Sequence, residues 1–292
     1  MISSWLGRKK EDATAMLSTP ELTASDFKAI STLVMERCGI HLHSGKQELV
    51  KARLGKRLRT LGFETWRQYL NLLKEDESGD EITSMLDAIS TNLTYFFREN
   101  SHFDFLAQTI LPAVVATADK RGRKLRIWSA GCSTGEEPYT IALVLSECIP
   151  DLDRWDAKIL ATDLSTRVLA KAKNGHYEPE RLQDLPHTLR SKYFFETAVD
   201  GQTRFQVRPE LRRLVHFARL NFMESWPLRG PFDVIFCRNV MIYFTHETRN
   251  QMIRQFWSLL PMGGYFLIGH SESLTGLNHE FKYLKPSTYQ KT

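Results

Sequence analysis

Acidic and amide side chains recur in this sequence directly after short apolar runs. The members of the set are Glu136, Glu137, Asp163, Asn221 and Asn239; Phe222 follows Asn221, and Arg238 precedes Asn239. Carboxylates attract cations and accept hydrogen bonds from hydroxyl groups, but they repel phosphate. The set therefore favours a cationic ligand that carries hydroxyl groups.

The first turn of this set lies in IWSAGCSTGEEPYTIAL, residues 127–143. It is rich in small residues but lacks the G-x-G-x-x-G spacing that cradles a pyrophosphate. Asp163 is an acidic residue of the kind that binds ribose hydroxyls. An adenosine with a positively charged amino-acid moiety suits this combination, and S-adenosylmethionine is such a ligand.

Each of these residues also has a purely structural interpretation. Glu136 or Glu137 could stabilise a helix N-terminus, and Asp163 could be the N-cap of the helix STRVLAKAK. Asn239 could be a turn residue. Their recurrence after successive runs favours the ligand site.

A parallel sheet would bring this set together. Beyond residue 120, short apolar runs alternate with helical segments, which is typical of a doubly wound α/β domain. The runs are 125–128, 158–161, 215–217, 232–237 and 264–268. Ligands bind outside the carboxyl ends of such strands. The polar turn ETAVDGQT interrupts the alternation and predicts a small β insertion at about 175–216.

A second polar group lies in SMLDAISTNLTYFFRENSHFDFL. The apolar residues of this segment, among them Leu93, keep helical spacing only loosely, and its threonines and asparagine are poor residues for a helix interior. Buried polar side chains need partners. Asn92, Thr94 and Arg98 are therefore candidates for lining the site, although Arg98 could instead be a surface cation beside Glu99.

The front of the chain has a different pattern. Apolar residues recur at spacings of three and four over 21–90, which predicts an all-helical domain. Residues 1–20 are expected to form a mobile tail, 91–101 a linker that contributes to the active site, and 102–292 the α/β domain.

Positive charge is concentrated in this front part. Residues 1–70 hold 12 Lys and Arg against 7 Asp and Glu, a surplus equal to the +5 of the whole chain. Lys46, Arg53 and Arg57 recur at helical spacing and predict a basic stripe for an acidic partner. The alternative is an ordinary solvated helix face.

Composition excludes several classes of protein. The chain of 292 residues is 42% hydrophobic and 25% charged, and no apolar run approaches the roughly 20 residues of a membrane span. The four cysteines form no C-x-x-C pair and the histidines are dispersed, so we expect buried thiols and no metal site. The protein is expected to be cytoplasmic, without membrane insertion.

Four separated motifs resemble those of the CheR family of chemotaxis receptor glutamate methyltransferases. They are TNLTYFFRE, WSAGCSTGEEPYTIA, FDVIFCRNVMIYF and GYFLIGHSESL. The resemblance runs from about Phe27 to the C-terminus. It implies a class I S-adenosylmethionine-dependent methyltransferase with a Rossmann-like sheet, a C-terminal antiparallel hairpin, an N-terminal all-helical domain and a small β insertion.

The resemblance also implies an activity and a set of site residues. The activity is transfer of a methyl group from S-adenosylmethionine to receptor glutamates, which leaves S-adenosylhomocysteine and a glutamate methyl ester. The implied cofactor contacts are Asn92, Thr94, Arg98, Glu137, Asp163, Asn221, Phe222, Arg238 and Asn239. Phe222 would act through its backbone, and Arg98 and Tyr243 are the expected catalytic residues. Lys46, Arg53 and Arg57 would dock on the cytoplasmic receptor helices.

Two further points concern partners. Family members that hold a receptor C-terminal peptide carry a Gly-x-Gly turn in the insertion, whereas this chain has only Gly201, which favours independence from the peptide. No Pro-Pro-Tyr follows Asn239, which argues against nucleic-acid methylation. A methyltransferase for another protein or RNA, and a non-catalytic S-adenosylmethionine-binding regulator, are the alternative functions. A monomer is expected.

Overall fold

The computed structural model describes residues 20–292, apart from the side chain at position 121. Contacts divide the described residues into two units, 20–32 with 43–89 and 33–42 with 90–292. The mobile tail predicted for 1–20 lies outside the described residues, except for Pro20.

The first unit is helical, as the periodicity predicts. Its elements are most of α1 (Ala24–Cys38), a 3-10 turn (Ser44–Lys46), α2 (Gln47–Leu61), α3 (Trp66–Glu75) and α4 (Asp80–Ile89). Gly62 ends α2 in the left-handed region, and Thr65 and Gln68 form a capping box at the start of α3. The buried face of α2 consists of Val50, Leu54, Gly55 and Leu58.

The second unit contains a seven-stranded sheet in the order β6-β2-β1-β7-β8-β10-β9. The strands are β1 (Lys124–Ala130), β2 (Asp156–Asp163), β6 (Val215–Arg219), β7 (Val234–Cys237), β8 (Tyr265–Ile268), β9 (Lys282–Lys285) and β10 (Thr288–Gln290). The five neighbouring strands β6, β2, β1, β7 and β8 are parallel to one another. β10 is antiparallel to both β8 and β9. Each of the five predicted apolar runs forms one of the parallel strands, so the predicted fold class is confirmed.

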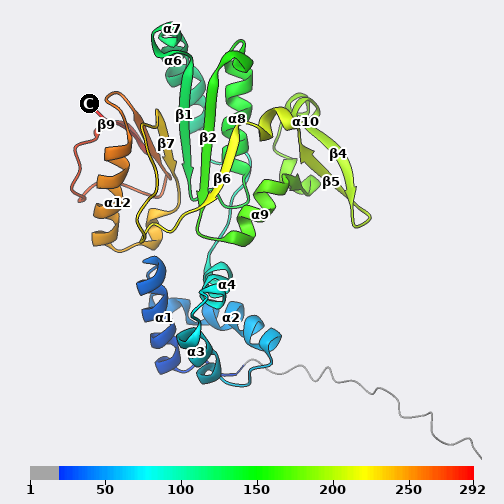
Figure 1. Cartoon of the computed structure of the whole chain (residues 1–292), viewed down its shortest axis with the longest axis vertical. Helices are drawn as coiled ribbons and strands as arrows, with labels where there is room; N and C mark the ends of the chain where they lie inside the picture. Colours follow the sequence, from blue (N-terminus) through cyan, green and yellow to red (C-terminus); the bar gives the residue numbers. More distant parts are fainter. Residues whose placement is uncertain (1–19) are drawn as a thin grey trace, which may run out of the picture. The chain divides into compact units, whose positions relative to one another are not determined.

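Helices cover both faces of this sheet, and the residues of each strand alternate between them. Val234 and Phe236 of β7 pack in one buried cluster with α8 (Glu136–Cys148), whereas Ile235 and Cys237 pack in the other cluster with α12 (His246–Leu259). Figure 1 shows α8 and α12 on opposite sides of the strands. Because of this alternation, neighbouring residues of a strand face different helical layers.

The remaining elements flank the sheet. Before β1 the chain forms α5 (Ser101–Phe105), a π-helical turn (Leu106–Ile110), α6 (Leu111–Ala116) and α7 (Ala118–Arg121); 3-10 turns follow at Leu152–Arg154 and Met241–Tyr243. After α9 (Thr166–Asn174) comes the insertion, with β3 (His176–Tyr177), a 3-10 turn (Pro179–Leu182), α10 (His187–Tyr193), β4 (Phe194–Val199), β5 (Gln202–Val207) and α11 (Pro209–Arg212). Its three strands form an antiparallel sheet in the order β3-β5-β4.

Two expectations from composition can be checked directly. Cys38, Cys132 and Cys237 are buried, but Cys148 is exposed, so the prediction for this thiol was wrong. It lies in the last turn of α8, where the helix face turns outward. Among the described residues, no helix is both long and apolar enough to cross a membrane.

Candidate functional site

The segment of residues 90–100, between α4 and α5, is not helical. α4 ends at Ile89, and Leu93 is 67% exposed. The loose helical spacing of the apolar residues therefore does not correspond to a helix beyond Ile89. Phe97 and Glu99 have positive φ values of 56° and 55°, in the region that L-residues rarely adopt. The residues on both sides of Arg98 thus have left-handed backbone conformations.

Backbone carbonyls anchor this segment, that of Asn92 to the turn after β1 and that of Thr94 to the insertion. The Ser133 hydroxyl donates to the Asn92 carbonyl at 3.0 Å, and Arg181 Nη1 donates to the Thr94 carbonyl at 2.8 Å. Ser133 in turn donates its backbone N–H to Asp163 Oδ2 at 2.8 Å. Asn92 is thus held beside the carboxyl ends of β1 and β2, and Thr94 beside the 3-10 turn of the insertion.

Gly131, directly after β1, is required by its surroundings. Its φ is +87°, and a Cβ atom there would lie 2.3 Å from Val240 Cγ2. The N–H groups of Gly131 and Cys132 both donate to the Thr162 carbonyl at 2.8 Å. The turn after β1 is therefore drawn tightly against the end of β2 and the loop after β7.

Asp163 ends β2 and is not the N-cap of the next helix. Ser165 caps α9 by accepting from the N–H of Val168, so the N-cap interpretation of Asp163 was wrong. The Asp163 carboxylate instead accepts from the N–H groups of Ser133 and Ser165, at 2.8 and 2.9 Å. These bonds orient a half-buried carboxylate at the ligand-binding edge of the sheet.

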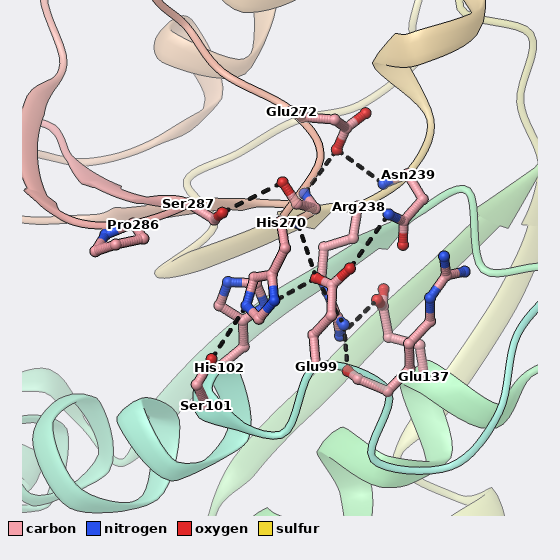
Figure 2. Close-up of polar contacts among 12 residues, drawn as sticks. Glu99, Ser101, His102, Glu137, Arg238, Asn239, His270, Glu272, Pro286 and Ser287 are labelled. Carbon is pink, nitrogen blue, oxygen red and sulfur yellow. Dashed lines mark hydrogen bonds and ion pairs between the residues drawn. The ribbon is translucent and has the colours of Figure 1, made fainter.

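Arg238, directly after β7, is buried between two carboxylates (Figure 2). Its Nη2 lies 3.2 Å from Glu99 Oε2 and its Nη1 lies 3.3 Å from Glu137 Oε2. Nη2 also donates to the Arg98 carbonyl. The structure thus brings Arg238, Glu137 and the backbone of Arg98 together. The positive charge of Arg238 is paired with Glu99 and Glu137.

The two carboxylates differ in their electrostatics. Burial raises the pKa of Glu137, although Arg238 and the Ser129 hydroxyl, which donates at 2.6 Å, oppose this effect. Burial would also raise the pKa of Glu99, but Arg238, Asn239 and His270 outweigh it and hold that pKa below its usual value. Glu137 therefore lacks full compensation, and a nearby cation would stabilise its ionised form.

Asn239 is a turn residue, as one interpretation proposed, with φ = 58°. Its N–H donates to Glu272 at 2.8 Å, and the same carboxylate accepts from the N–H groups of Val240, Ile242 and Gly269. One side chain thus gathers four backbone donors and shapes the loop after β7. The Asn239 side-chain amide lies 3.3 Å from Glu99 Oε1.

Asn221 and Phe222 have other partners. Asn221 is 4% exposed; its amide donates to the Arg37 carbonyl at 2.7 Å and to Glu224 at 3.0 Å. The Phe222 ring packs edge-on against Trp226. Contact of these two residues with the cofactor stays a prediction. It would be made by their backbone atoms, or by the Asn221 side chain after it leaves its present partners.

The two expected catalytic residues lie on different segments. Arg98 Nη1 donates to the Leu93 carbonyl at 2.7 Å, and its charge acts on Glu137. Tyr243 ends the 3-10 turn after β7, is half-buried, and its carbonyl accepts from the N–H of His41 at 2.8 Å. Their catalytic roles stay predictions.

Comparison with known protein families decides the assignment of this chain. The model described as "CheR methyltransferase, SAM binding domain" matches residues 92–290, and "CheR methyltransferase, all-alpha domain" matches residues 25–90. The chain belongs to the CheR methyltransferase family. It is an S-adenosylmethionine-dependent methyltransferase.

Relatives of similar length support the assignment. The chain is 42% identical to a chemotaxis protein methyltransferase of Borreliella burgdorferi, with 92% of this chain and 95% of that protein covered. Identity to proteins of the same name is 39% in Escherichia coli, covering 93% of both chains, and 40% in Klebsiella aerogenes, covering 91% of this chain and 89% of that protein. The similarity to CheR proteins therefore spans both units.

The CheR cofactor is compatible with the side chains at this edge of the sheet. Arg238 is matched by Glu99 and Glu137, which leaves it poorly suited to grip phosphate. Asp163 is an oriented acceptor for hydroxyl groups, and Glu137 has a charge that a cation would stabilise. A sulfonium nucleoside meets these conditions better than a dinucleotide does.

The predicted docking stripe of this CheR protein has partners within the helical unit. Arg57 Nε lies 2.9 and 3.2 Å from the two Glu81 carboxylate oxygens, and Arg53 Nη1 donates to the Ile89 carbonyl. Both side chains connect α2 with α4 and are half-buried, whereas Lys46 is exposed. The docking role of all three stays a prediction, and two of them also have structural roles.

Sequence reasoning missed four polar residues of this site. Glu99, His102, His270 and Glu272 surround Arg238 and Asn239 in Figure 2. Glu99 and Glu272 lie inside quoted motifs, so their position was a usable signal. His270 lies in the same motif as Glu272, but nothing linked it to His102, since 168 residues separate the two histidines in the sequence.

Proposed function

We propose that this CheR protein transfers the methyl group of S-adenosylmethionine to glutamate side chains of chemotaxis receptors in the cytoplasm, giving methyl esters. The observation that carries the proposal is the similarity to chemotaxis protein methyltransferases over both units and nearly the whole of each protein. The carboxylate-rich edge of the sheet supports the choice of cofactor.

In this proposal, the cofactor is held by side chains that follow the parallel strands. Asp163 would accept hydrogen bonds from ribose hydroxyls, because its carboxylate is already oriented by two backbone donors. Glu137 would face positive charge, with Arg238 fixing its position. Asn92, Thr94, Asn221, Phe222 and Asn239 would complete the contacts.

The reaction needs no general base. When bound, the cofactor supplies a methyl group on a positively charged sulfur. A glutamate carboxylate is ionised at neutral pH and can attack this methyl group directly, so the protein must exclude water and align the two groups. Arg98 and Tyr243 would hold the acceptor carboxylate in register.

These two roles have a direct test. Arg98→Ala and Tyr243→Phe should each lower turnover while leaving the protein folded. Full activity in both variants would remove both residues from the mechanism. Cofactor affinity, measured by calorimetry on the same variants, separates a loss of catalysis from a loss of binding.

The helical unit would meet the receptor. The basic surface of α2, to which the exposed Lys46 contributes, would attract the acidic helices of the receptor. Lys46→Gln should weaken binding to receptor fragments at low salt and leave folding intact. Binding that is independent of salt would contradict docking by charge.

The activity itself is tested by labelled methyl transfer. The purified full chain is incubated with radiolabelled S-adenosylmethionine and either receptor cytoplasmic fragments or total RNA. Base-labile label on receptor protein supports the proposal. Base-stable label or labelled RNA supports another methyltransferase, and cofactor binding without transfer supports a regulator. The same fragments with and without their C-terminal peptide test the expected independence from it.

A further inference from the structure

Three potential metal ligands meet beside Arg238, in a cluster made of Glu99, His102 and His270. One donor atom from each residue lies within 4.8 Å of the other two. His102 Nδ1 is 3.6 Å from Glu99 Oε2, and the two imidazole rings are 4.9 Å apart between centroids. Figure 2 shows both rings on one side of the Glu99 carboxylate.

His102 lacks the partners that a buried imidazole normally has. Its side chain is 1% exposed, and among the described residues neither ring nitrogen has a hydrogen-bond partner. Unpaired polar atoms are costly in a protein interior and usually indicate a missing partner such as an ion or water. The Nδ1 atom of this ring lies 3.6 Å from the Glu99 carboxylate, which is too far for a hydrogen bond.

The geometry points to a site for a divalent transition-metal ion, with zinc as the representative, bound by Glu99, His102 and His270. Two imidazoles and one carboxylate are a common ligand set for zinc and ferrous iron. Nitrogen and oxygen ligands at about 2.0 Å from zinc lie about 3.3 Å apart in a tetrahedron. The distance of 3.6 Å between Glu99 Oε2 and His102 Nδ1 is close to this value. The ring of His270 is exposed and can rotate to bring its donor atom from within 4.8 Å to this distance.

The surroundings suit such an ion. Glu99 Oε2 accepts from the backbone N–H of His270 at 3.1 Å, and the Ser101 hydroxyl lies 3.2 Å from His270 Nε2, so hydrogen bonds restrain both Glu99 and His270. Arg238 opposes a cation because it contacts the same carboxylate. Three carboxylates, of Glu99, Glu137 and Glu272, lie in this part of the site, and the cations Arg98, Arg238 and Lys285 that act on it balance them.

A bound ion would connect two parts of the site. Glu99 and His102 follow the segment that contributes Arg98, whereas His270 precedes Glu272, which shapes the loop of Asn239. The ion would thus fix the frame around Arg238 without touching the acceptor. Metal binding is read directly and does not depend on the methyl transfer, so either proposal can fail alone.

The test uses the full chain, freed of any affinity tag and stripped with a chelator. Zn²⁺ is titrated by calorimetry, and Co²⁺ is added to observe its visible absorption in a site of low coordination number. We expect one equivalent to bind and to raise the melting temperature. His270→Ala, which removes an exposed ring, should weaken binding at least about 10-fold.

The control is His41→Ala with His43→Ala, which removes the closest pair of histidines in the sequence. This variant should bind the metal as the wild type does. The inference is overturned if Zn²⁺ does not bind, if His270→Ala binds equally well, or if the control loses the site. Because His102→Ala could unfold the chain, His102→Gln with an unchanged circular dichroism spectrum is the second ligand variant.

Discussion

Glu99 and Arg238 form an ion pair in the interior, with 3.2 Å between Oε2 and Nη2, although 139 residues separate them in the chain. The pair joins the irregular segment after α4 to the end of β7. Through Arg238 it also restrains Glu137, so one guanidinium sets the positions of two carboxylates.

Removing this guanidinium should be costly. Arg238→Ala leaves Glu99 and Glu137 uncompensated in a buried site, so we expect a loss of about 3–5 kcal/mol in the free energy of unfolding. Urea unfolding measures it. Arg154→Ala, which removes an exposed cation beside Asp151, should change stability by less than about 0.5 kcal/mol. Equal losses in both variants would contradict the role of Arg238.

Asp163→Asn should weaken S-adenosylmethionine binding about 10-fold to 100-fold, because a charge-assisted hydrogen bond contributes about 1.5–3 kcal/mol. The fold should survive, since Ser165 still caps α9. Calorimetry gives the affinity, and Asp119→Asn, a change at an exposed carboxylate, is the matched control. Unchanged affinity would remove Asp163 from the cofactor site.

Gly131 and Gly201 offer a comparison between two glycines of positive φ. Gly131→Ala adds a clash with Val240 to the backbone strain and should cost about 2–4 kcal/mol, whereas Gly201→Ala meets no atom within 4 Å and should cost about 1–2 kcal/mol. Thermal unfolding compares them. Val240→Ala should recover part of the Gly131→Ala loss; no recovery would mean that the clash is not its cause.

Arg57→Ala should loosen the helical unit. Glu81 is largely buried and would lose its bidentate partner, at a cost of about 1–3 kcal/mol. Hydrogen exchange should become faster in α2 and α4. Lys56→Ala, on the exposed side of α2, should leave exchange unchanged. If Arg57→Ala impairs receptor binding without faster exchange, its role is docking rather than structure.

Acid should destabilise the protein through His102. Burial, then Arg238, His270 and Lys285, lower its pKa to about 3 in spite of the opposing Glu99. Because the unfolded imidazole takes up a proton near pH 6.5, this neutral histidine stabilises the fold above that pH, and the contribution is lost as pH falls towards 3.

The slope can reach about 1.4 kcal/mol per pH unit in this window. Urea unfolding at pH 7 and pH 5, with a chelator present, should show a smaller pH effect in His102→Gln than in the wild type. His187→Gln removes an exposed histidine and should keep the wild-type effect. A wild-type pH effect in His102→Gln would contradict this assignment.

The strands could be predicted from the sequence because their signal is local. Apolar runs such as 232–237 mark a strand buried on both faces, and parallel strands bring the residues after them to one edge, as Asp163 and Arg238 show. The partners of these residues could not be predicted. Glu99 is far from Arg238 in the sequence, and only the folded chain brings the two together. Asn221 donates to the backbone carbonyl of Arg37, and a backbone acceptor cannot be recognised from the residue type.

The hairpin of β4 and β5 projects from the large sheet in Figure 1 and turns at Asp200 and Gly201, both with positive φ. A Cβ atom at Gly201 would meet open space. An engineer could therefore graft a fluorophore or a small reporter module at this tip and follow the enzyme's encounters with its receptors in living cells.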